Sequence, residues 1–481
     1  MEEVGKVGLG DRVVRHPRQQ ELEPIHISSP RPRSTSRRFD SPFVLIYVFA
    51  FMIVVGTVVL WLPFFNNDGG FTPILTALFT ATSAVTTTGL VVENSATYWN
   101  RGGQVVLMLL LTVGGLGFMS TATFLLIVIA QRISLTNLLI MRESTGMSRR
   151  TDLFRLTIQV VAISILIQTI AFGMFFWRFG FAQDALFPES LREAAWHAAF
   201  LSASAFNNAG FNILPQFASE KVFGSELWIL GGMTILIICG GISYAVLVDI
   251  VRFKRFNRFR LDSRLIIIFS LALWTLGAVA ILGFEGSNPE TLQGFSIVEQ
   301  VPHAIFQSVS GRTAGLSSIN FADTEQHTNF FFIGLMFIGG ASGSTASGIK
   351  INTLAIILVA VLASIRGRTQ VEVFGREIIQ EQVQRALAIG VLGLLAVFII
   401  AVFLTLAEGF PFINILFETV SALANVGLSS GITADLSAWG RIILVVAMFI
   451  GRLGPLTFAL AFARREPHAL YRYSVETVKI G

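Results

Sequence analysis

Four short segments of the chain combine hydroxyl, amide or small side chains with one glycine. They are Thr87-Thr88-Gly89, Asn208-Ala209-Gly210, Thr313-Ala314-Gly315 and Asn425-Val426-Gly427. The glycines lie 121, 105 and 112 residues apart, and a stretch that opens with Phe and continues with Ser or Thr precedes each one. Backbone carbonyls of such segments, gathered around one axis, can replace the hydration shell of a dehydrated monovalent cation. Glycine suits this chemistry because inward-pointing carbonyls need unusual φ values and leave no room for a Cβ.

The repetition of the segments decides between two interpretations. A single segment of this kind is better explained as a bend in a packed helix. Four copies, each at the end of a short apolar stretch, favour one shared site instead. The C-terminal end of a helix carries partial negative charge, so four such ends that point at one axis favour cations and disfavour anions. The sequence therefore predicts a cation site built from four re-entrant segments.

The elements that would position these segments are apolar. Of the 481 residues, 53% are apolar and 14% are charged, with a mean hydropathy of +0.68, so the chain needs a solvent other than water. Eight long apolar segments are expected near 43–62, 104–130, 152–177, 226–249, 264–284, 329–364, 386–407 and 438–463. Within each successive pair lies a stretch too short to span a membrane, at 72–84, 190–205, 297–311 and 411–424. The pattern predicts an all-α polytopic membrane protein with eight transmembrane helices, in which a helix, a re-entrant pore helix and a helix are repeated four times around one pseudo-fourfold pore.

The predicted organisation has six parts. They are a basic, largely disordered cytoplasmic tail (1–41), pore repeats 1 to 4 (42–130, 152–249, 264–365 and 384–465) and a cytoplasmic C-terminus (466–481). Of the 35 Lys and Arg residues, 26 lie in residues 1–41 and 464–481 and in the loops 131–151, 250–264 and 365–385. The positive-inside rule then places both termini in the cytoplasm and all four re-entrant loops outside. The tail is better interpreted as a solvated segment that touches anionic lipid than as an arm that binds nucleic acid. Membrane lipid is therefore an expected partner, and nucleic acid is not.

A glycine- and serine-rich run interrupts the sixth apolar segment between Gly339 and Lys350. As one helix, the stretch from Asn329 to Ser364 would be about 54 Å long, which is too long for one span. Close packing of small residues is the alternative, but a flexible loop beneath the glycine segments explains both features. Its candidate residues are Gly340, Ala341, Ser342, Gly343, Ser344, Thr345, Ala346, Ser347, Gly348 and Lys350. An ammonium group at the end of this loop would repel cations in a closed state.

Two further charged residues stand in apolar surroundings. Arg452 is a lone charge in the last apolar segment, where insertion costs about 2.5–3.5 kcal/mol, so it should face the protein interior or a water-filled path. Snorkelling to the membrane interface is the alternative. We expect Glu418, in the fourth half-helix, to form hydrogen bonds that brace the nearby glycine segment.

These residues resemble the Trk/Ktr/HKT superfamily of potassium transporters, and within it most closely the pore-forming membrane subunit of Ktr systems. The resemblance covers roughly residues 42–465. Its most specific parts are the Gly/Ser-rich run, Phe206-Asn207-Asn208-Ala209-Gly210-Phe211, Arg312-Thr313-Ala314-Gly315, Asn425-Val426-Gly427-Leu428-Ser429 and Phe449-Ile450-Gly451-Arg452-Leu453-Gly454-Pro455-Leu456. The chain departs from the family at two positions, with Gly311 where threonine is expected and Thr87 where valine is expected.

The resemblance implies roles for the segments. The four glycine segments are a selectivity filter that binds K+ at its backbone carbonyls, and Gly89 goes with potassium selectivity. The Gly/Ser-rich loop is an intramembrane gate, and Arg452 is a positive barrier near it, so the resemblance implies that Arg452 contacts the loop. The resemblance further implies a multi-pass protein of the cell (cytoplasmic) membrane, a homodimer, sodium stimulation, and a separate cytoplasmic ring of nucleotide-binding, RCK-type regulatory subunits. K+ is the transported ion, Na+ is a second candidate, and no organic cofactor is expected.

Other classes of function fit less well. A sodium-permeable or weakly selective cation transporter of the same fold is the first alternative, and Gly89 counts against it. An enzyme is not expected, because no two of the six histidines have i, i+4 spacing and no Gly-x-Ser-x-Gly motif has a plausible base. The sequence has no Gly-x-x-x-x-Gly-Lys-Ser/Thr motif, so nucleotide control would need another subunit. A proton-coupled carrier would need ionisable residues in mid-span, where these segments are nearly bare apart from Arg452.

Overall fold

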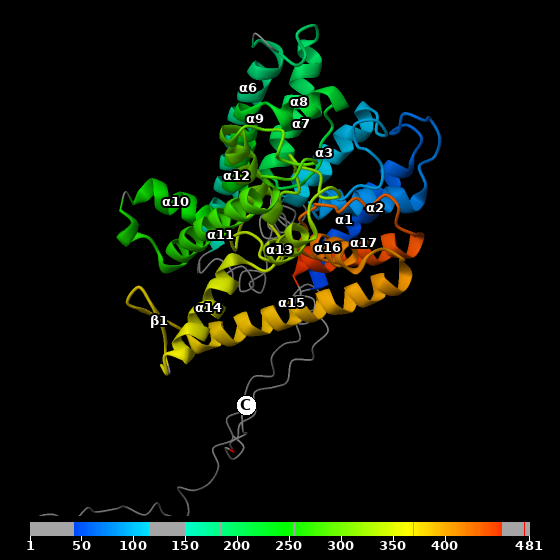
Figure 1. Ribbon diagram of the computed structural model, residues 1–481. Helices are drawn as coiled ribbons and strands as arrows, with labels where there is room; N and C mark the ends of the chain where they lie inside the picture. Colours follow the sequence, from blue (N-terminus) through cyan, green and yellow to red (C-terminus); the bar gives the residue numbers. More distant parts are fainter. Residues whose placement is uncertain are drawn as a thin grey trace, which may run out of the picture. The chain divides into compact units, whose positions relative to one another are not determined.

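The computed structural model describes residues 43–115, 150–182, 185–253, 255–368 and 370–454, together with Glu476. Helices make up most of these residues (Figure 1). The predicted tail 1–41 lies outside them. So do most of the C-terminus 466–481 and the later parts of the segments expected at 104–130 and 438–463.

Helices occupy most of the segments that were expected to be apolar. They are α1 (Phe43–Trp61), α3 (Arg101–Gly115), α6 (Arg150–Gly180), α9 (Leu227–Gly241), α11 (Leu261–Glu285), α13 (Gln326–Phe337), α14 (Ile351–Ile365), α15 (Gln380–Ala407) and α17 (Ala438–Leu453). Within the described ranges, α6 from Ile158 onward, α11 and α15 are long and apolar enough to cross a membrane, and α9 forms a fourth candidate with the helix that follows it. The chain is thus helical with several apolar helices, while the count of eight spans stays a prediction.

Four helices of 12 to 17 residues, which we call the short helices, lie where the re-entrant stretches were expected. They are α2 (Ile74–Val85), α7 (Leu191–Phe206), α12 (Ile297–Thr313) and α16 (Phe412–Ala424). Pro73 and Pro411 directly precede α2 and α16, positions at which a missing N–H costs nothing. Ser190 caps α7, and Ser296 forms a capping box with Glu299 at the start of α12. The local sequence therefore defines where each short helix begins.

The contacts of the short helices close a circle. Each contacts the helices before and after it in the chain: α2 contacts α1 and α3, α7 contacts α6 and α9, α12 contacts α11 and α13, and α16 contacts α15 and α17. We call each short helix, together with the helices before and after it, a helical set. Each short helix also contacts a helix of a neighbouring set: α7 contacts α3, α12 contacts α9, α16 contacts α13, and α2 contacts α17. The last of these contacts joins the first and last helical sets of the described chain. The ends of the four short helices can therefore meet at one place.

The Phe that opens each of the four glycine-bearing stretches is a core residue. Phe79, Phe200, Phe306 and Phe417 are at most 1% exposed. Phe417, for example, packs against Phe321 with ring centroids 5.3 Å apart. Large aromatic side chains dominate the energetics of a packed core, so the shared Phe fixes each short helix against its neighbours.

The segment expected at 226–249 is two helices rather than one. α9 ends at Gly241, and α10 (Tyr244–Arg252) continues at an angle of 101° to it. The backbone of Gly240 packs so closely on Phe206 that a Cβ would lie 1.9 Å from the Phe206 carbonyl oxygen. Ser243 then caps α10 by accepting a hydrogen bond from the backbone N–H of Ala245. Tight packing and a new cap together break the helix at this point.

Three small elements lie in connections that the sequence left without structure. They are the helix α8 (Gln216–Gly224), the 3-10 turn η2 (Phe256–Arg258) and an antiparallel hairpin of β1 (Val371–Val373) and β2 (Arg376–Ile378). In the hairpin, Val371 pairs with Ile378 and both are buried. Elements this short give no usable hydrophobic period, which explains why they were not predicted.

Candidate functional site

The four repeated glycines lie against one another. Each has a positive φ: +95° at Gly89, +73° at Gly210, +69° at Gly315 and +92° at Gly427. A Cβ on Gly89 would lie 2.7 Å from the Cα of Gly210, and one on Gly315 or Gly427 would lie 3.0 Å from the Cα of the next glycine in the circle. L side chains rarely adopt this φ, and the space for a Cβ is already occupied. Glycine is therefore required at all four positions.

The carbonyl that precedes each glycine completes a closed ring. A Cβ on Gly89 would meet the carbonyl oxygen of Ala209 at 2.8 Å, and one on Gly210 would meet that of Ala314 at 3.0 Å. In the same way, Gly315 faces the carbonyl of Val426, and Gly427 faces that of Thr88. The order runs from the first segment to the second, third and fourth and back to the first. We call this arrangement the glycine ring, and it brings the twelve residues predicted from the four segments to one place.

A serine in each short helix positions the backbone beside its glycine. Each of the four lies four residues after the core Phe of its helix. Ser83 and Ser421 accept hydrogen bonds from the backbone N–H groups of Gly89 and Gly427, at 3.0 and 3.1 Å. Ser204 and Ser310 instead donate to the carbonyls of the residues that follow the other two glycines. The sequence indicated hydroxyl residues in these helices, and the structure identifies which hydroxyl acts on the ring.

Two asparagines join neighbouring segments of the glycine ring. Asn208 and Asn425 have left-handed backbones, with φ of +51° and +53°. Asn425 donates from Nδ2 to the hydroxyl of Thr88 at 2.8 Å. Asn208 accepts from the hydroxyl of Thr313 at 3.3 Å. Thr87 also has a left-handed backbone, with φ of +53°, an uncommon conformation for a β-branched residue.

The Gly/Ser-rich run is a loop between α13 and α14. Two hydrogen bonds close its neck, from the N–H of Gly339 to the carbonyl of Ile349 at 2.9 Å and from that of Ile351 to the carbonyl of Gly340 at 3.0 Å. The body of the loop binds the end of α9, because the N–H of Ala341 donates to Gly241 and that of Thr345 donates to Gly240. These are the residues at which α9 breaks from α10.

Asn208 and Thr345 connect the loop to the glycine ring. Asn208 donates from Nδ2 to the hydroxyl oxygen of Thr345 at 2.8 Å. That hydroxyl donates in turn to the carbonyl of Gly240 at 2.9 Å. The predicted filter and the predicted gate therefore share a direct side-chain contact.

Arg452 and Arg312 both bind the loop, although the sequence singled out only the first. Arg452 is 7% exposed and donates from Nη1 to the carbonyl of Thr345 at 2.8 Å and to the hydroxyl of Ser347 at 2.7 Å. The predicted contact between Arg452 and the loop is thus confirmed. Arg312 is 2% exposed and donates from Nη2 to the carbonyl of Gly339 at 2.8 Å. A charged residue near the end of a short helix, directly before the segment Thr313-Ala314-Gly315, was the available signal.

Lys350 is the last residue of the loop, and its side chain contacts the same loop. Its ammonium group donates to the carbonyl of Ala346, within the same loop. Of the predicted gate residues, Ser342 and Gly343 are exposed, whereas Ala341, Thr345, Ala346 and Ser347 are buried. The loop is thus packed on the protein on one side and open on the other.

Glu418 braces the segment that follows Gly427, as was predicted. This fully buried carboxylate accepts hydrogen bonds from the hydroxyl of Ser429 at 2.5 Å, the N–H of Ser430 at 3.0 Å and the hydroxyl of Thr433 at 2.9 Å. A buried carboxylate needs several such donors to be stable. Glu418 was singled out in the sequence because it is an acidic residue inside the fourth half-helix.

Comparison with known proteins identifies the class to which this site belongs. The model of the TrkH family, described as a cation transport protein, matches residues 28–472. The chain therefore belongs to the TrkH family, and the predicted resemblance to Trk/Ktr membrane subunits is confirmed. Because members of this family are cation transporters, the chain is a multi-pass membrane transporter and not an enzyme.

Individual relatives agree with this assignment. The Ktr system potassium uptake protein B of Bacillus subtilis (strain 168) is 37% identical over 440 residues, which cover 89% of this chain and 94% of the relative. The potassium/sodium uptake protein NtpJ of Enterococcus hirae is 33% identical over 456 residues, covering 92% of this chain and 98% of the relative. The crystal structure of the potassium transporter TrkH from Vibrio parahaemolyticus matches with a TM-score of 0.68 and 18% identity, over 89% of this chain and 86% of that one. At that identity the structural match establishes the fold.

Proposed function

We propose that this protein takes up potassium ions across the cell membrane through the glycine ring. The observation that carries the proposal is the closed circle in which the carbonyls of Thr88, Ala209, Ala314 and Val426 each lie beside the next glycine. Such a circle offers the oxygen ligands that replace water around a monovalent cation. Potassium is favoured because the relative from B. subtilis is named as a potassium uptake protein and the one from E. hirae as a potassium/sodium uptake protein, each aligned over most of this chain.

In this proposal the loop from Ile338 to Lys350 is the gate. It contacts the glycine ring through Asn208, and it is bound by the guanidinium groups of Arg312 and Arg452. Three positive charges, counting Lys350, lie within or against this segment. A cation leaving the ring on the loop side meets both a steric block and unfavourable charge, so the loop must move for ions to pass.

We propose an orientation and partners that follow from the basic residues and from the resemblance. Both termini lie in the cytoplasm, and the four short helices enter the membrane from outside, in accordance with the positive-inside rule. The membrane subunit works as a homodimer with a separate cytoplasmic ring of RCK-type nucleotide-binding subunits. Sodium stimulates transport.

The alternative is a sodium-permeable or weakly selective cation transporter of the same fold. One observation favours it: the relative from E. hirae is named as a potassium/sodium uptake protein. The two functions differ in whether sodium competes with potassium for the glycine ring.

Potassium-limited growth of an uptake-deficient bacterial strain tests the proposal. The strain would express the parent chain or the substitutions Gly89→Ser and Gly315→Ser, with a cytoplasmic regulatory subunit co-expressed where the chain alone fails. Gly69→Ser is a matched control, because Gly69 also has a positive φ, of +68°, but has no atom within 4 Å of where its Cβ would lie. Membrane-inserted protein is quantified for every variant.

The proposal predicts rescue by the parent and by Gly69→Ser, and loss of uptake or of potassium preference in both ring variants. Rescue by ring variants with unchanged preference would contradict it. Equal uptake of sodium and potassium by the parent would establish the alternative.

A further inference from the structure

The chain turns sharply between α9 and α11. We call residues 244–258, which contain α10 and η2, the elbow. α10 leaves the apolar helix α9 at 101°, and after η2 the chain enters the apolar helix α11. A helix that lies nearly perpendicular to a membrane-crossing neighbour runs along the membrane boundary. The elbow therefore lies between two apolar segments, at the level where α11 begins.

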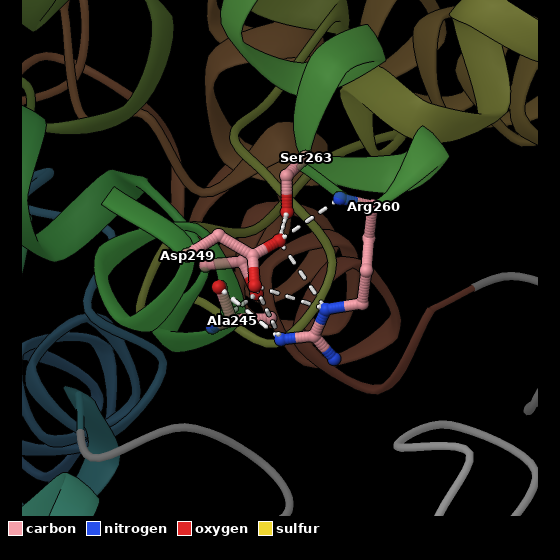
Figure 2. A network of polar contacts seen from close by, with 5 residues as sticks. Ala245, Asp249, Arg260 and Ser263 are labelled. Atoms are coloured by element: carbon pink, nitrogen blue, oxygen red, sulfur yellow. Dashed lines mark hydrogen bonds and ion pairs between the residues drawn. The ribbon is translucent and has the colours of Figure 1, made fainter. Parts of the chain in front are cut away.

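One face of the elbow is fixed to the start of α11 by the network in Figure 2. The buried carboxylate of Asp249 accepts hydrogen bonds from the hydroxyl of Ser263 at 2.6 Å and from Nη2 of Arg260 at 3.1 Å. Arg260 also donates from Nη2 to the carbonyl of Ala245 at 3.4 Å. Asp249 is the acidic residue of the elbow, and its carboxylate is occupied by Arg260 and Ser263.

The exposed residues of the elbow combine apolar side chains with arginines. Ile250 is 48% exposed and Val251 is 84% exposed. Arg252, Arg255 and Arg258 are exposed as well, and none of the three has a carboxylate partner among the described residues. In water the valine would be left hydrated and the arginines unpaired. At a lipid boundary the apolar side chains enter the acyl region while the guanidinium groups reach the phosphates.

We propose that the elbow binds the headgroups of anionic phospholipids through Arg252, Arg255 and Arg258, with Val251 inserted among the acyl chains. Guanidinium groups bind phosphate oxygens in a bidentate manner. Anionic lipid is favoured over a protein partner because the exposed apolar residues lie on a helix between two membrane segments, with no acidic residue left to pair the arginines.

The elbow lies next to the predicted gate. The carbonyls of Gly240 and Gly241, at the bend that opens the elbow, accept hydrogen bonds from the N–H groups of Thr345 and Ala341. Lipid bound at the elbow therefore acts on the same bend to which the loop is attached. This consequence rests on the proposed function, whereas lipid binding itself does not.

Thermal unfolding of the purified full-length chain in neutral detergent tests the binding. The parent is compared with R252Q/R255Q/R258Q and with R366Q/R368Q/R376Q, which removes the same charge from exposed arginines elsewhere in the basic connections. The rise in Tm is titrated with short-chain phosphatidylglycerol, with phosphatidylcholine and with inorganic phosphate. Each basic residue at an anionic surface contributes about fivefold to binding, so the triple elbow variant should need on the order of 100-fold more phosphatidylglycerol for half the shift.

For the control triple variant, the phosphatidylglycerol concentration that gives half the shift in Tm should stay within about twofold of the parent's value, because in this proposal charge away from the elbow has no specific role. An equal loss in both triple variants would overturn the proposal, as would a shift given equally by phosphatidylcholine or inorganic phosphate. An elbow variant that keeps its lipid response but no longer binds a cytoplasmic regulatory subunit would assign the surface to a protein partner instead. Because Tm requires no transport, a negative result here is separate from failure of potassium uptake.

Discussion

The glycine ring and the loop from Ile338 to Lys350 are neighbours, yet different interactions position them. In the ring, each glycine lies against backbone atoms of the next segment, and neutral side chains such as Ser83 and Asn425 supply the remaining hydrogen bonds. The loop is bound instead by two guanidinium groups, from Arg312 and Arg452, and by the carbonyls at the end of α9.

This difference separates a part that has one arrangement from a part that can have two. The glycines of the ring have no space for a side chain, because a Cβ on any of them would come within about 3 Å of backbone atoms. The neck of the loop is closed by hydrogen bonds between Gly339 and Ile349 and between Gly340 and Ile351. Its body is attached by a few separate hydrogen bonds, which can break while the neck stays closed. In the proposed function, selectivity belongs to the rigid part and gating to the movable one.

The largest effect is expected from adding one methyl group to the ring. In Gly427→Ala the Cβ would lie 1.9 Å from the carbonyl oxygen of Thr88, so potassium uptake should be lost. Gly343→Ala is the matched change in the loop, since Gly343 has a φ of +75° but its Cβ would come no closer than 3.5 Å to Ser243. It carries only the backbone penalty of about 1–2 kcal/mol. Potassium uptake by cells, normalised to membrane-inserted protein, measures both variants.

Similar uptake by the two alanine variants would remove the distinction between the ring and the loop. If Gly343→Ala alone lost uptake, the rigid part would be the loop.

The second effect concerns the arginines of the loop. Arg452→Gln removes a charge and its hydrogen bonds to Thr345 and Ser347 in the body of the loop. Hydrogen bonds to charged groups contribute about 1.5–3 kcal/mol, so potassium flux into liposomes without a regulatory subunit should rise about tenfold or more. Arg312→Gln removes contacts with Ile338 and Gly339 at the neck, which two backbone hydrogen bonds still close, so its rise should be smaller. A fall in flux for well-folded Arg452→Gln would contradict a barrier role.

The comparison of these two arginines also indicates what a sequence can reveal. Arg452 was predicted to face the interior because a lone charge in an apolar segment must find polar groups, and the family resemblance implied that the loop supplies them. Arg312 stands beside the third filter segment, where the motif itself accounted for its presence. Its partner, the carbonyl of Gly339, lies 27 residues further along the chain. Only the packing of α12 against α13 brings the two together, and no local pattern encodes that packing.

The fold, like the two arginines, was predictable where local sequence decides it and not where tertiary contacts do. Repetition and hydrophobic length gave the positions of the four short helices to within a few residues, because both are properties of local sequence. The break between α9 and α10 was missed, since the pair Gly240-Gly241 resembles any glycine pair in an apolar helix. The break depends on the loop, whose Ala341 and Thr345 take up the carbonyls that a continuous helix would use. Tertiary contacts decided this element.

The third effect tests the connection between the two regions. Thr345→Val removes the hydroxyl that accepts from Asn208 and donates to Gly240. One hydrogen bond contributes about 0.5–1.5 kcal/mol, so potassium flux should change about two- to tenfold while ion preference stays the same. Ser342→Ala is the control in the same loop, because Ser342 is exposed and its described contact is a backbone one, to Asn352. A change in potassium preference in Thr345→Val would mean that the loop also shapes the ring.

The smallest effect is expected where a charge in the ring region is neutralised without loss of its hydrogen bonds. In Glu418→Gln the remaining oxygen can accept from Ser429 and Ser430, while the new amide group faces the hydroxyl of Thr433. That hydroxyl also contacts the hydroxyl of Ser429 at 2.9 Å, so it can turn and accept. The free energy of unfolding should therefore change by less than about 1 kcal/mol, and potassium preference should be kept.

Glu418→Ala is the contrasting variant, because it leaves the buried N–H of Ser430 without its acceptor. Each unsatisfied buried group costs about 1–3 kcal/mol, so this variant should lower Tm and weaken potassium preference. If Glu418→Gln were as damaging as Glu418→Ala, the negative charge itself would be needed near the ring, and neutral hydrogen bonding would not be what positions it. If both variants were silent, the segment after Gly427 would be fixed by backbone packing alone. The pair thus separates charge, hydrogen bonding and packing as the source of the rigidity of the ring.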